Sequence, residues 1–257
     1  MQTVVEIRAM LQAADAAEFA VLERALKADT RKGVAQAVEA ARRRLAADAE
    51  ERRRVAALYS FQASLGGGVI LGLDEVGRGP LAGPLTIGGV VLPDEPQVLG
   101  LNDSKQIPEA KRRAISDEVR ATAIAWTIQH IPPERIDELG MSACLRQAFR
   151  AAIDDIEARG VKVDAILLDG NPLHLDPREV NVVKGDAKCA SIAAASIIAK
   201  VERDSLMCEY AEMYPEYGFE KNKGYGSGAH IDAIAQFGLS PIHRRSFCHF
   251  EVQETLF

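Results

Sequence analysis

The chain has 257 residues, of which 47% are hydrophobic, so it can form one large α/β domain with a small appendage. Its net charge of −6 argues against a protein that coats nucleic acid by bulk charge. No apolar run is long enough to span a membrane, the N-terminus lacks the apolar core of a signal peptide, and the four cysteines are far apart. These features predict a cytoplasmic protein with reduced thiols, and any nucleic-acid enzyme of this composition needs a local basic surface or bound cations.

The first 62 residues are predicted to be helical almost throughout. They are rich in Ala, Leu, Glu and Arg, and they carry basic triplets at 42–44 and 52–54. Two interpretations stay open for them: a solvated helical hairpin or adaptor, and a surface that contacts nucleic acid. Three glycines at 66–68 end the helical composition. The predicted domains are a helical extension over 1–65, a larger domain over 66–250 and a tail over 251–257.

Beyond the glycines the pattern alternates between strands and helices. The helices are predicted from Pro108 to about Ala121, over 142–160 with one apolar face, and over 187–214, where the first half is almost all small residues. Such a small-residue helix can lie very close to a sheet. The alternation is typical of an α/β fold. The predicted strands are 69–74, 85–92, 122–128, 163–169 and 179–184.

Acidic residues stand at the ends of two predicted strands. Asp74 and Glu75 follow the first strand, and Asp169 closes another. Because the reactive crevice of an open α/β sheet lies at the carboxyl ends of its strands, these acids are placed to converge, although alternation along a strand would put Asp74 and Glu75 on opposite faces. Asp186 is a fourth candidate. Each acid also has a structural interpretation: a helix N-cap for Asp186, an Asp-Gly turn for Asp169, and a turn or salt bridge for the pair.

A cluster of these carboxylates would need compensation for its charge. Two unit charges about 4 Å apart repel by about 4 kcal/mol at an effective dielectric constant of about 20. The cluster therefore favours either a shared proton or bound cations. Magnesium and manganese prefer oxygen ligands, and a pair of such ions can activate a water and stabilise the leaving oxygen of a phosphodiester. The acids therefore predict a site for Mg²⁺ or Mn²⁺.

Two glycine-rich segments could contact a nucleic acid. Gly77, Arg78 and Gly79 form a Gly-x-Gly loop in which the backbone can approach a ligand and the arginine can meet a phosphate. The spacing fits neither a dinucleotide fingerprint nor a P-loop. Downstream, "EKNKGYGSGAH" places Tyr225 among lysines and glycines, a mixture typical of stacking on a sugar or base. A mobile loop with a packed tyrosine is the alternative.

From about residue 69 to 250 the chain resembles the ribonuclease HII family, the type 2 bacterial ribonucleases H. The N-terminal extension is similar to the one that some members carry. The resemblance implies a ribonuclease H-like fold, with a mixed sheet flanked by helices and a helical C-terminal part. The segments that carry it are "LDEVGRGPLAGP", "LNDSKQI", "LLDGNP", "VVKGDAK", "SIAAASIIAKVERD", "YGFEKNKGYGS" and "HRRSF".

The resemblance implies a metal-dependent endonuclease with roles in DNA replication and repair. Such enzymes hydrolyse the RNA strand of RNA/DNA hybrids and cut 5′ to ribonucleotides embedded in duplex DNA, using two metal ions and leaving 3′-hydroxyl and 5′-phosphate ends. Gln106 departs from the family, because many members have a second lysine there. By the same resemblance the catalytic, metal-binding acids are Asp74, Glu75, Asp169 and Asp186, the loop that reads the 2′-hydroxyl is Gly77, Arg78 and Gly79, the stacking residue is Tyr225, and the basic positions near the substrate are Lys105 and Arg244.

Two other functions are alternatives to this one. The first is a type 3 ribonuclease H, which prefers longer hybrids, and the second is a non-catalytic module that binds hybrids or a clamp. The glycine-rich loop with Tyr225 and the four intact carboxylates favour the type 2 enzyme. The C-terminal "QETLF", with Gln253, Leu256 and Phe257, resembles the Gln-x-x-Leu-Phe peptides that dock on the bacterial sliding clamp; a plain terminus is the alternative. A monomer without membrane contact is expected.

Overall fold

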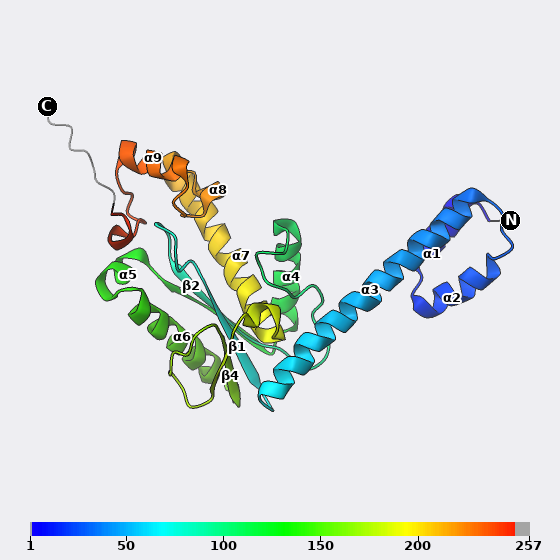
Figure 1. The fold of residues 1–257 in the computed structure, drawn as a ribbon, viewed down its shortest axis with the longest axis horizontal. Helices are drawn as coiled ribbons and strands as arrows, with labels where there is room; N and C mark the ends of the chain where they lie inside the picture. Colours follow the sequence, from blue (N-terminus) through cyan, green and yellow to red (C-terminus); the bar gives the residue numbers. More distant parts are fainter. Residues whose placement is uncertain (1, 250–257) are drawn as a thin grey trace. The chain divides into compact units, whose positions relative to one another are not determined.

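The computed structural model describes residues 2–249, so the expected clamp-binding tail lies outside the described residues. Its chain divides into two compact units, Met1–Ala56 and Ala57–Phe257, and Figure 1 labels helices and strands where there is room. The helix α3 (Lys32–Leu65) begins in the first unit and ends in the second. In the part of the chain that is described, no helix is long and apolar enough to cross a membrane.

The N-terminal unit is helical, as the composition predicted. It contains α1 (Val4–Ala13), α2 (Ala16–Ala25) and the first part of α3. The first two helices each begin with a capping box, in which the cap side chain and a glutamate three residues later exchange hydrogen bonds with the backbone. These helices enclose a small core of their own, formed by Ile7, Leu11, Ala14, Phe19, Val34, Ala37 and Ala41.

The second unit is built on a mixed five-stranded sheet, which confirms the predicted fold class. Its strand order is β3-β2-β1-β4-β5. The first three strands of that order pair antiparallel, and β1, β4 and β5 pair in parallel. Each strand lies within three residues of its predicted bounds. The strands are β1 (Ile70–Val76), β2 (Leu85–Val91), β3 (Ala125–Ile131), β4 (Ala165–Asp169) and β5 (Glu179–Val182).

Helices cover both faces of this sheet (Figure 1). The helix α6 (Met141–Ala158) packs through Phe149 and Ile153 on the face to which Leu71 and Leu73 point. The helix α7 (Ala190–Met213) crosses the opposite face, where it contacts β1 and β2 and is flanked by α4 (Glu109–Thr122). The remaining helical elements are α5 (Pro133–Leu139), α8 (Phe219–Asn222), α9 (Gly228–Phe237) and the short 3-10 turns Gly185–Ala187, Pro215–Tyr217 and Arg245–Phe247.

The small-residue half of α7 lies against the sheet, as its composition predicted. A Cβ atom added to Gly72 would stand 2.3 Å from the backbone carbon of Ser191, so only glycine fits below the helix at that point. The beginning of the helix differs from one expectation. Asp186 is not its N-cap, because α7 begins at Ala190 after Cys189, and the carboxamide of Gln62 from α3 accepts from the Ser191 N–H at 2.7 Å.

Candidate active site

The four acids named from the sequence line one cavity. It has a volume of about 400 Å³ and lies where β1 and β4 end. The glycine-rich loop and Tyr225 border the same space, so segments more than 140 residues apart in the chain meet there. Its lining consists of Asp74, Glu75, Val76, Gly77, Arg78, Gly79, Ser104, Lys105, Asp169, Asp186, Ser196, Lys200 and Tyr225.

Asp74 and Glu75 reach this cavity from opposite faces of β1. Leu71 and Leu73 point into the core under α6, so Glu75 shares their face, whereas Asp74 points toward α7 and is only 6% exposed. The strand ends just beyond them, at Val76, and the space opens around its end. Glu75 also borders a second cavity of about 220 Å³ on the α6 side. Alternation along the strand is therefore preserved, and the site straddles the strand.

The other two acids are joined to this pair by strand pairing and by a backbone hydrogen bond. Leu73 pairs with Leu168 in the parallel register, so the residues that follow, Asp74 and Asp169, are neighbours at the same sheet edge. An oxygen of Asp169 accepts from the Gly185 N–H at 2.6 Å. That bond holds the short 3-10 turn that carries Asp186 beside the strand end.

Burial is the main reason why the pKa values of three of these carboxyl groups are raised. The pKa of Asp74 lies well above its ordinary value because the group is buried and faces the charges of Glu75 and Asp169, while a hydrogen bond from Ser196 opposes the shift. Burial also raises the pKa of Glu75, against the attraction of Arg78, and that of Asp186, with help from the charge of Asp169. Burial and mutual repulsion therefore disfavour the charged forms of these acids, a condition that favours either a bound proton or bound cations.

The donor set fits Mg²⁺ or Mn²⁺ better than a metal that needs a complete protein cage. All four candidate ligands offer oxygen, the donor that these hard cations prefer. Within residues 2–249, no three side chains of His, Cys, Asp or Glu are grouped so that they could hold an ion by themselves. Magnesium usually binds through one or two carboxylates and completes its coordination with water and substrate phosphate. An open cavity bordered by separate carboxylates suits that mode.

Two buried arginines hold the glycine-rich loop from behind. Arg244 donates to the carbonyl oxygens of Gly77, Arg78 and Gly83. Arg203 donates to those of Ala82 and Pro84. Both side chains are fully buried. Neither forms an ion pair with a carboxylate in the described part of the chain. Burial lowers the pKa of Arg244 to about 9, with a contribution from the nearby charge of Arg203.

Arg244 therefore does not occupy the place that the sequence suggested. It was expected to contact substrate, but its buried guanidinium faces loop carbonyls instead of the cavity. Its side chain is connected to the cavity only through the loop whose carbonyl oxygens it bonds. The reason is packing: the segment that carries Arg244 pairs with the loop backbone, since its N–H donates to the Leu81 carbonyl at 2.8 Å.

The remaining predicted contacts face the cavity. The side chain of Arg78 is exposed, and its Nη1 lies 3.6 Å from Oε1 of Glu75. Tyr225 is 49% exposed. Lys105 lines the cavity, whereas the neighbouring Gln106 is not among the lining residues. Sequence reasoning missed Lys200, which borders the cavity and pairs with Asp204 at 2.7 Å. The available signal was its position one helical turn after Ser196 on α7.

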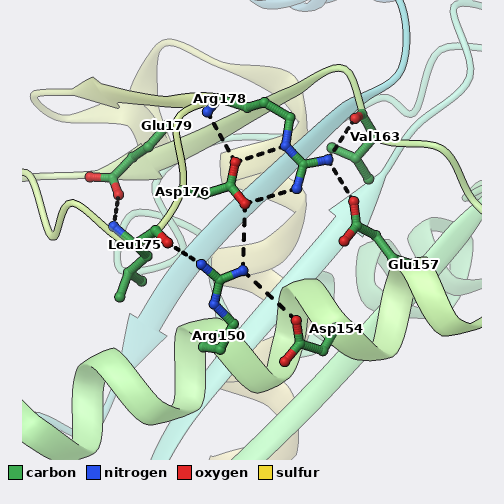
Figure 2. A network of polar contacts seen from close by, with 8 residues as sticks. All are labelled: Arg150, Asp154, Glu157, Val163, Leu175, Asp176, Arg178 and Glu179. Carbon is green, nitrogen blue, oxygen red and sulfur yellow. Dashed lines mark hydrogen bonds and ion pairs between the residues drawn. The ribbon is translucent and has the colours of Figure 1, made fainter.

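Hydrogen bonds and ion pairs outside the cavity hold the segment that follows Asp169 (Figure 2). The guanidinium of Arg178 donates two bonds to Asp176, at 2.8 and 2.9 Å, and also reaches Glu157 of α6 and the Val163 carbonyl. These bonds hold the pKa of Asp176 far below its ordinary value. Glu179 accepts from three backbone N–H groups of the same segment. The segment between β4 and β5 is thus joined to α6 and to Val163, just before β4 begins.

Comparisons with known proteins agree with this architecture. The sequence profile described as "Ribonuclease HII" matches residues 71–250, and "Ribonuclease HII N-terminal domain" matches residues 3–66. The chain belongs to the ribonuclease HII family. It is 40% identical over 253 residues to the ribonuclease HII of Halalkalibacterium halodurans, covering 97% of this chain and 94% of that one.

Solved structures share the fold of the second unit. The ribonuclease H2 of Pyrococcus horikoshii is 28% identical, with a TM-score of 0.59, over 72% of this chain and 95% of that one. A chain in the PCNA:RNase HII complex of Archaeoglobus fulgidus is 23% identical, with a TM-score of 0.62, over 73% of this chain and 98% of that one. The chain is therefore a metal-dependent ribonuclease H of type 2.

Proposed function

We propose that the protein hydrolyses the RNA strand of RNA/DNA hybrids and cuts 5′ to single ribonucleotides in duplex DNA, leaving 3′-hydroxyl and 5′-phosphate ends. One observation carries the proposal: four acids, the glycine-rich loop and Tyr225 border a single cavity. A phosphodiester held by the acids would have its sugar beside the loop. A non-catalytic module would not need four carboxylates in that space, where each raises the cost of ionising the others.

Asp74, Glu75, Asp169 and Asp186 are the residues proposed to hold two Mg²⁺ or Mn²⁺ ions. When bound, such ions supply an activated water and stabilise the leaving oxygen of the phosphodiester. The four acids are buried or half-buried, and all four line the cavity, so their charges act on what binds there. Lys105 and Lys200 border the same space and offer ammonium groups to the phosphates.

The loop formed by Gly77, Arg78 and Gly79 is proposed to read the 2′-hydroxyl of the ribonucleotide. The carbonyl groups of Gly77 and Arg78 are bonded to Arg244, which fixes the plane of each peptide and therefore the direction of its neighbouring N–H. A site with fixed polar groups that match a hydroxyl rejects the analogue without it by about 10⁴-fold or more, since those groups would be left unpaired. Tyr225 is proposed to stack on the deoxyribose that follows.

A labelled DNA duplex with one ribonucleotide tests the proposal. With Mg²⁺ or Mn²⁺ we expect one cut on the 5′ side of the ribonucleotide, and none in EDTA. Asp74→Asn should lower the rate by about a hundredfold or more, because it removes a charge from the reacting centre. The matched control is Asp117→Asn, an exposed acid of α4 outside the cavity, which should cut like the parent. A cut on the 3′ side, or undiminished cutting by Asp74→Asn, contradicts the proposal.

A second proposed contact is the sliding clamp, through Gln253, Leu256 and Phe257. The specific observation is the terminal "QETLF", which has the spacing of clamp-docking peptides. The Archaeoglobus fulgidus chain matched above was solved in a complex with PCNA. Deleting 253–257 should abolish clamp binding measured by surface plasmon resonance while leaving cleavage of the free duplex unchanged. Clamp binding that survives the deletion would refute this role.

A further inference from the structure

A buried chain of polar groups connects the C-terminal segment to Tyr225. The Ser240 N–H donates to Nδ1 of His243 at 2.9 Å, and the Nε2 atoms of His243 and His230 are 3.0 Å apart. At the other end, Nδ1 of His230 lies 2.8 Å from the carbonyl oxygen of Tyr225. His230 is fully buried and His243 is 3% exposed. The catalytic proposal uses neither histidine.

The partners at the two ends fix the tautomer of each imidazole. The Tyr225 carbonyl can only accept, so Nδ1 of His230 carries a hydrogen and its Nε2 is an acceptor. The Ser240 N–H can only donate, so Nδ1 of His243 is an acceptor and its Nε2 carries the hydrogen. The bond between the two rings therefore runs from His243 to His230. In this relay, which runs from Ser240 through His243 and His230 to Tyr225, each ring nitrogen either donates or accepts a hydrogen bond when both rings are neutral.

The surroundings of the relay favour the neutral rings. Two aromatic side chains enclose it: the ring of Tyr217 is 4.9 Å from that of His243, and the ring of Phe219 is 5.3 Å from that of His230. Burial lowers the pKa of both histidines, that of His243 to about 4. A charged imidazole would have to donate where it now accepts, so the geometry and the burial agree.

The relay ends on the same backbone frame that carries the glycine-rich loop. The Leu81 N–H donates to the Gly224 carbonyl, next to Tyr225, at 2.8 Å. Ala82 forms an antiparallel bridge with His243. His243 is thus attached to the loop through its backbone, and its side chain is linked to Tyr225 through His230. A shift of the relay would move Tyr225 relative to the loop.

We propose that His230, held in one tautomer by His243, is a positioning residue that sets the Tyr225 ring against the sugar beside the cleavage site. This inference rests on the proposed role of Tyr225 in binding the junction. His230 itself faces the Tyr225 backbone and does not touch substrate. By fixing the carbonyl of Tyr225 inward, it leaves the half-exposed ring directed to the cavity.

Two variants of His230 separate positioning from stability. His230→Asn keeps a donor near the place of Nδ1, so the bond to the Tyr225 carbonyl survives without help from His243. His230→Gln keeps a polar group near the place of Nε2 and loses the bond to Tyr225. Both are uncharged amides, and thermal unfolding of the full chain reports their stability. KM and kcat are measured in Mg²⁺ on the duplex with one ribonucleotide and on a uniform RNA/DNA hybrid.

We expect His230→Gln to raise KM on the single-ribonucleotide duplex about fivefold to tenfold, the range of one buried hydrogen bond, with kcat nearly unchanged. His230→Asn should stay within about twofold of the parent, as expected if its amide restores that bond. His243→Asn, which breaks the link between the rings, should raise KM at least about twofold. On the uniform hybrid, which lacks the ribose-to-deoxyribose junction, the effects should be smaller.

The Tyr225→Ala variant makes the outcome decisive. In that background His230→Gln should add less than about twofold to KM, because the ring that it positions is gone. If Tyr225→Ala itself behaves like the parent on the junction duplex, the proposed role of Tyr225 fails. If Tyr225→Ala is impaired but His230→Gln is not, or if His230→Gln acts equally with and without the ring, the positioning role of His230 is overturned.

Discussion

Two residues behind the cavity have charged side chains that are fully buried. Arg203 and Arg244 are the two largest fully buried side chains in the described chain, and both are cations bonded to backbone carbonyls. Burying a charge without a counter-ion is costly unless its donors are satisfied. Most of their bonds go to carbonyl oxygens of residues 77–84. These residues lie between β1 and β2, outside any helix or strand. The loop that borders the acids is therefore held by side chains where a sheet would use backbone pairing.

His243 should make the stability of the protein depend on mild acid. Its pKa lies near 4 in the folded chain and near 6.5 when unperturbed, because burial and the neighbouring His230 disfavour the cation. Between those values the unfolded chain binds the proton and the folded chain does not, so the free energy of unfolding falls as pH is lowered from about 6.5 toward about 4. At pH near 5 the loss from this group is about 2 kcal/mol.

Urea unfolding at pH near 7 and near 5 measures that loss. The matched variant His243→Gln has no imidazole at this position, so its decrease between the two conditions should be smaller by about 2 kcal/mol. Carboxylates such as Asp176, whose pKa is lowered by Arg178, lose their contribution only in stronger acid and should affect both proteins alike. Equal decreases in the two proteins would show that His243 is not the group that titrates.

The four acids could be named from the sequence, but the residues that hold the adjacent loop could not be assigned that role. Asp74, Glu75 and Asp169 stand at strand ends in an order that the sheet was expected to bring together, and the parallel pairing of β1 with β4 does so. The roles of Arg244 and His243 depend on which segment lies behind the loop, and a local pattern holds no such information. Both were visible as polar residues in "HRRSF", without any indication that they are buried.

At the scale of elements, the contact between α7 and the sheet determines how close the acids come to the helix that carries Ser196 and Lys200. The small residues of the helix meet glycines of the strands: a Cβ on Gly88 would stand 2.3 Å from the Ala195 carbonyl oxygen. Small-residue composition predicted close approach. The positions of contact were not predictable, because they depend on which turn of the helix lies above each strand.

Gly72→Ala should therefore destabilise the protein far more than an ordinary glycine substitution. The added carbon would meet two backbone atoms of α7, at 2.3 and 2.5 Å, and backbone cannot rotate away as a side chain can. Overpacking of this kind costs about 3 kcal/mol. Gly67→Ala is the control, since nothing lies within 4 Å of its added carbon, and it should change stability by less than about 0.5 kcal/mol. Urea unfolding compares them; similar values would contradict the close packing.

At the scale of the whole molecule, the charge of the N-terminal unit is largely satisfied within the unit. Residues 1–56 contain eleven Lys and Arg and nine Asp and Glu. Five of the six arginines in the two basic triplets form ion pairs with glutamates or aspartates of the same unit. Of the two interpretations open from the sequence, this arrangement favours a solvated helical extension over a surface that neutralises many phosphates.

The end of α3 has a different role from its beginning. The hydroxyl of Tyr59 accepts from the Val98 N–H at 3.2 Å, and Gln62 accepts from the N–H of Ser191 at the beginning of α7. Both side chains are buried and both belong to the second compact unit. The sequence predicts a boundary at the glycines after α3, and the last turns of that helix, just before this boundary, form buried contacts with the sheet domain.

Two truncations test this division of roles. A chain that begins at residue 57 keeps Tyr59 and Gln62, so its melting temperature and its cleavage of the hybrid should stay close to those of the full protein, with kcat/KM within about threefold and the same dependence on salt. A chain that begins at residue 67 loses both partners and should be less stable by about 2 kcal/mol or more, because two buried N–H groups lose their acceptors. Equal stability of the two chains would rule out the capping role of Gln62. A loss of cleavage larger than tenfold on removal of residues 1–56 alone would instead assign substrate binding to the helical extension.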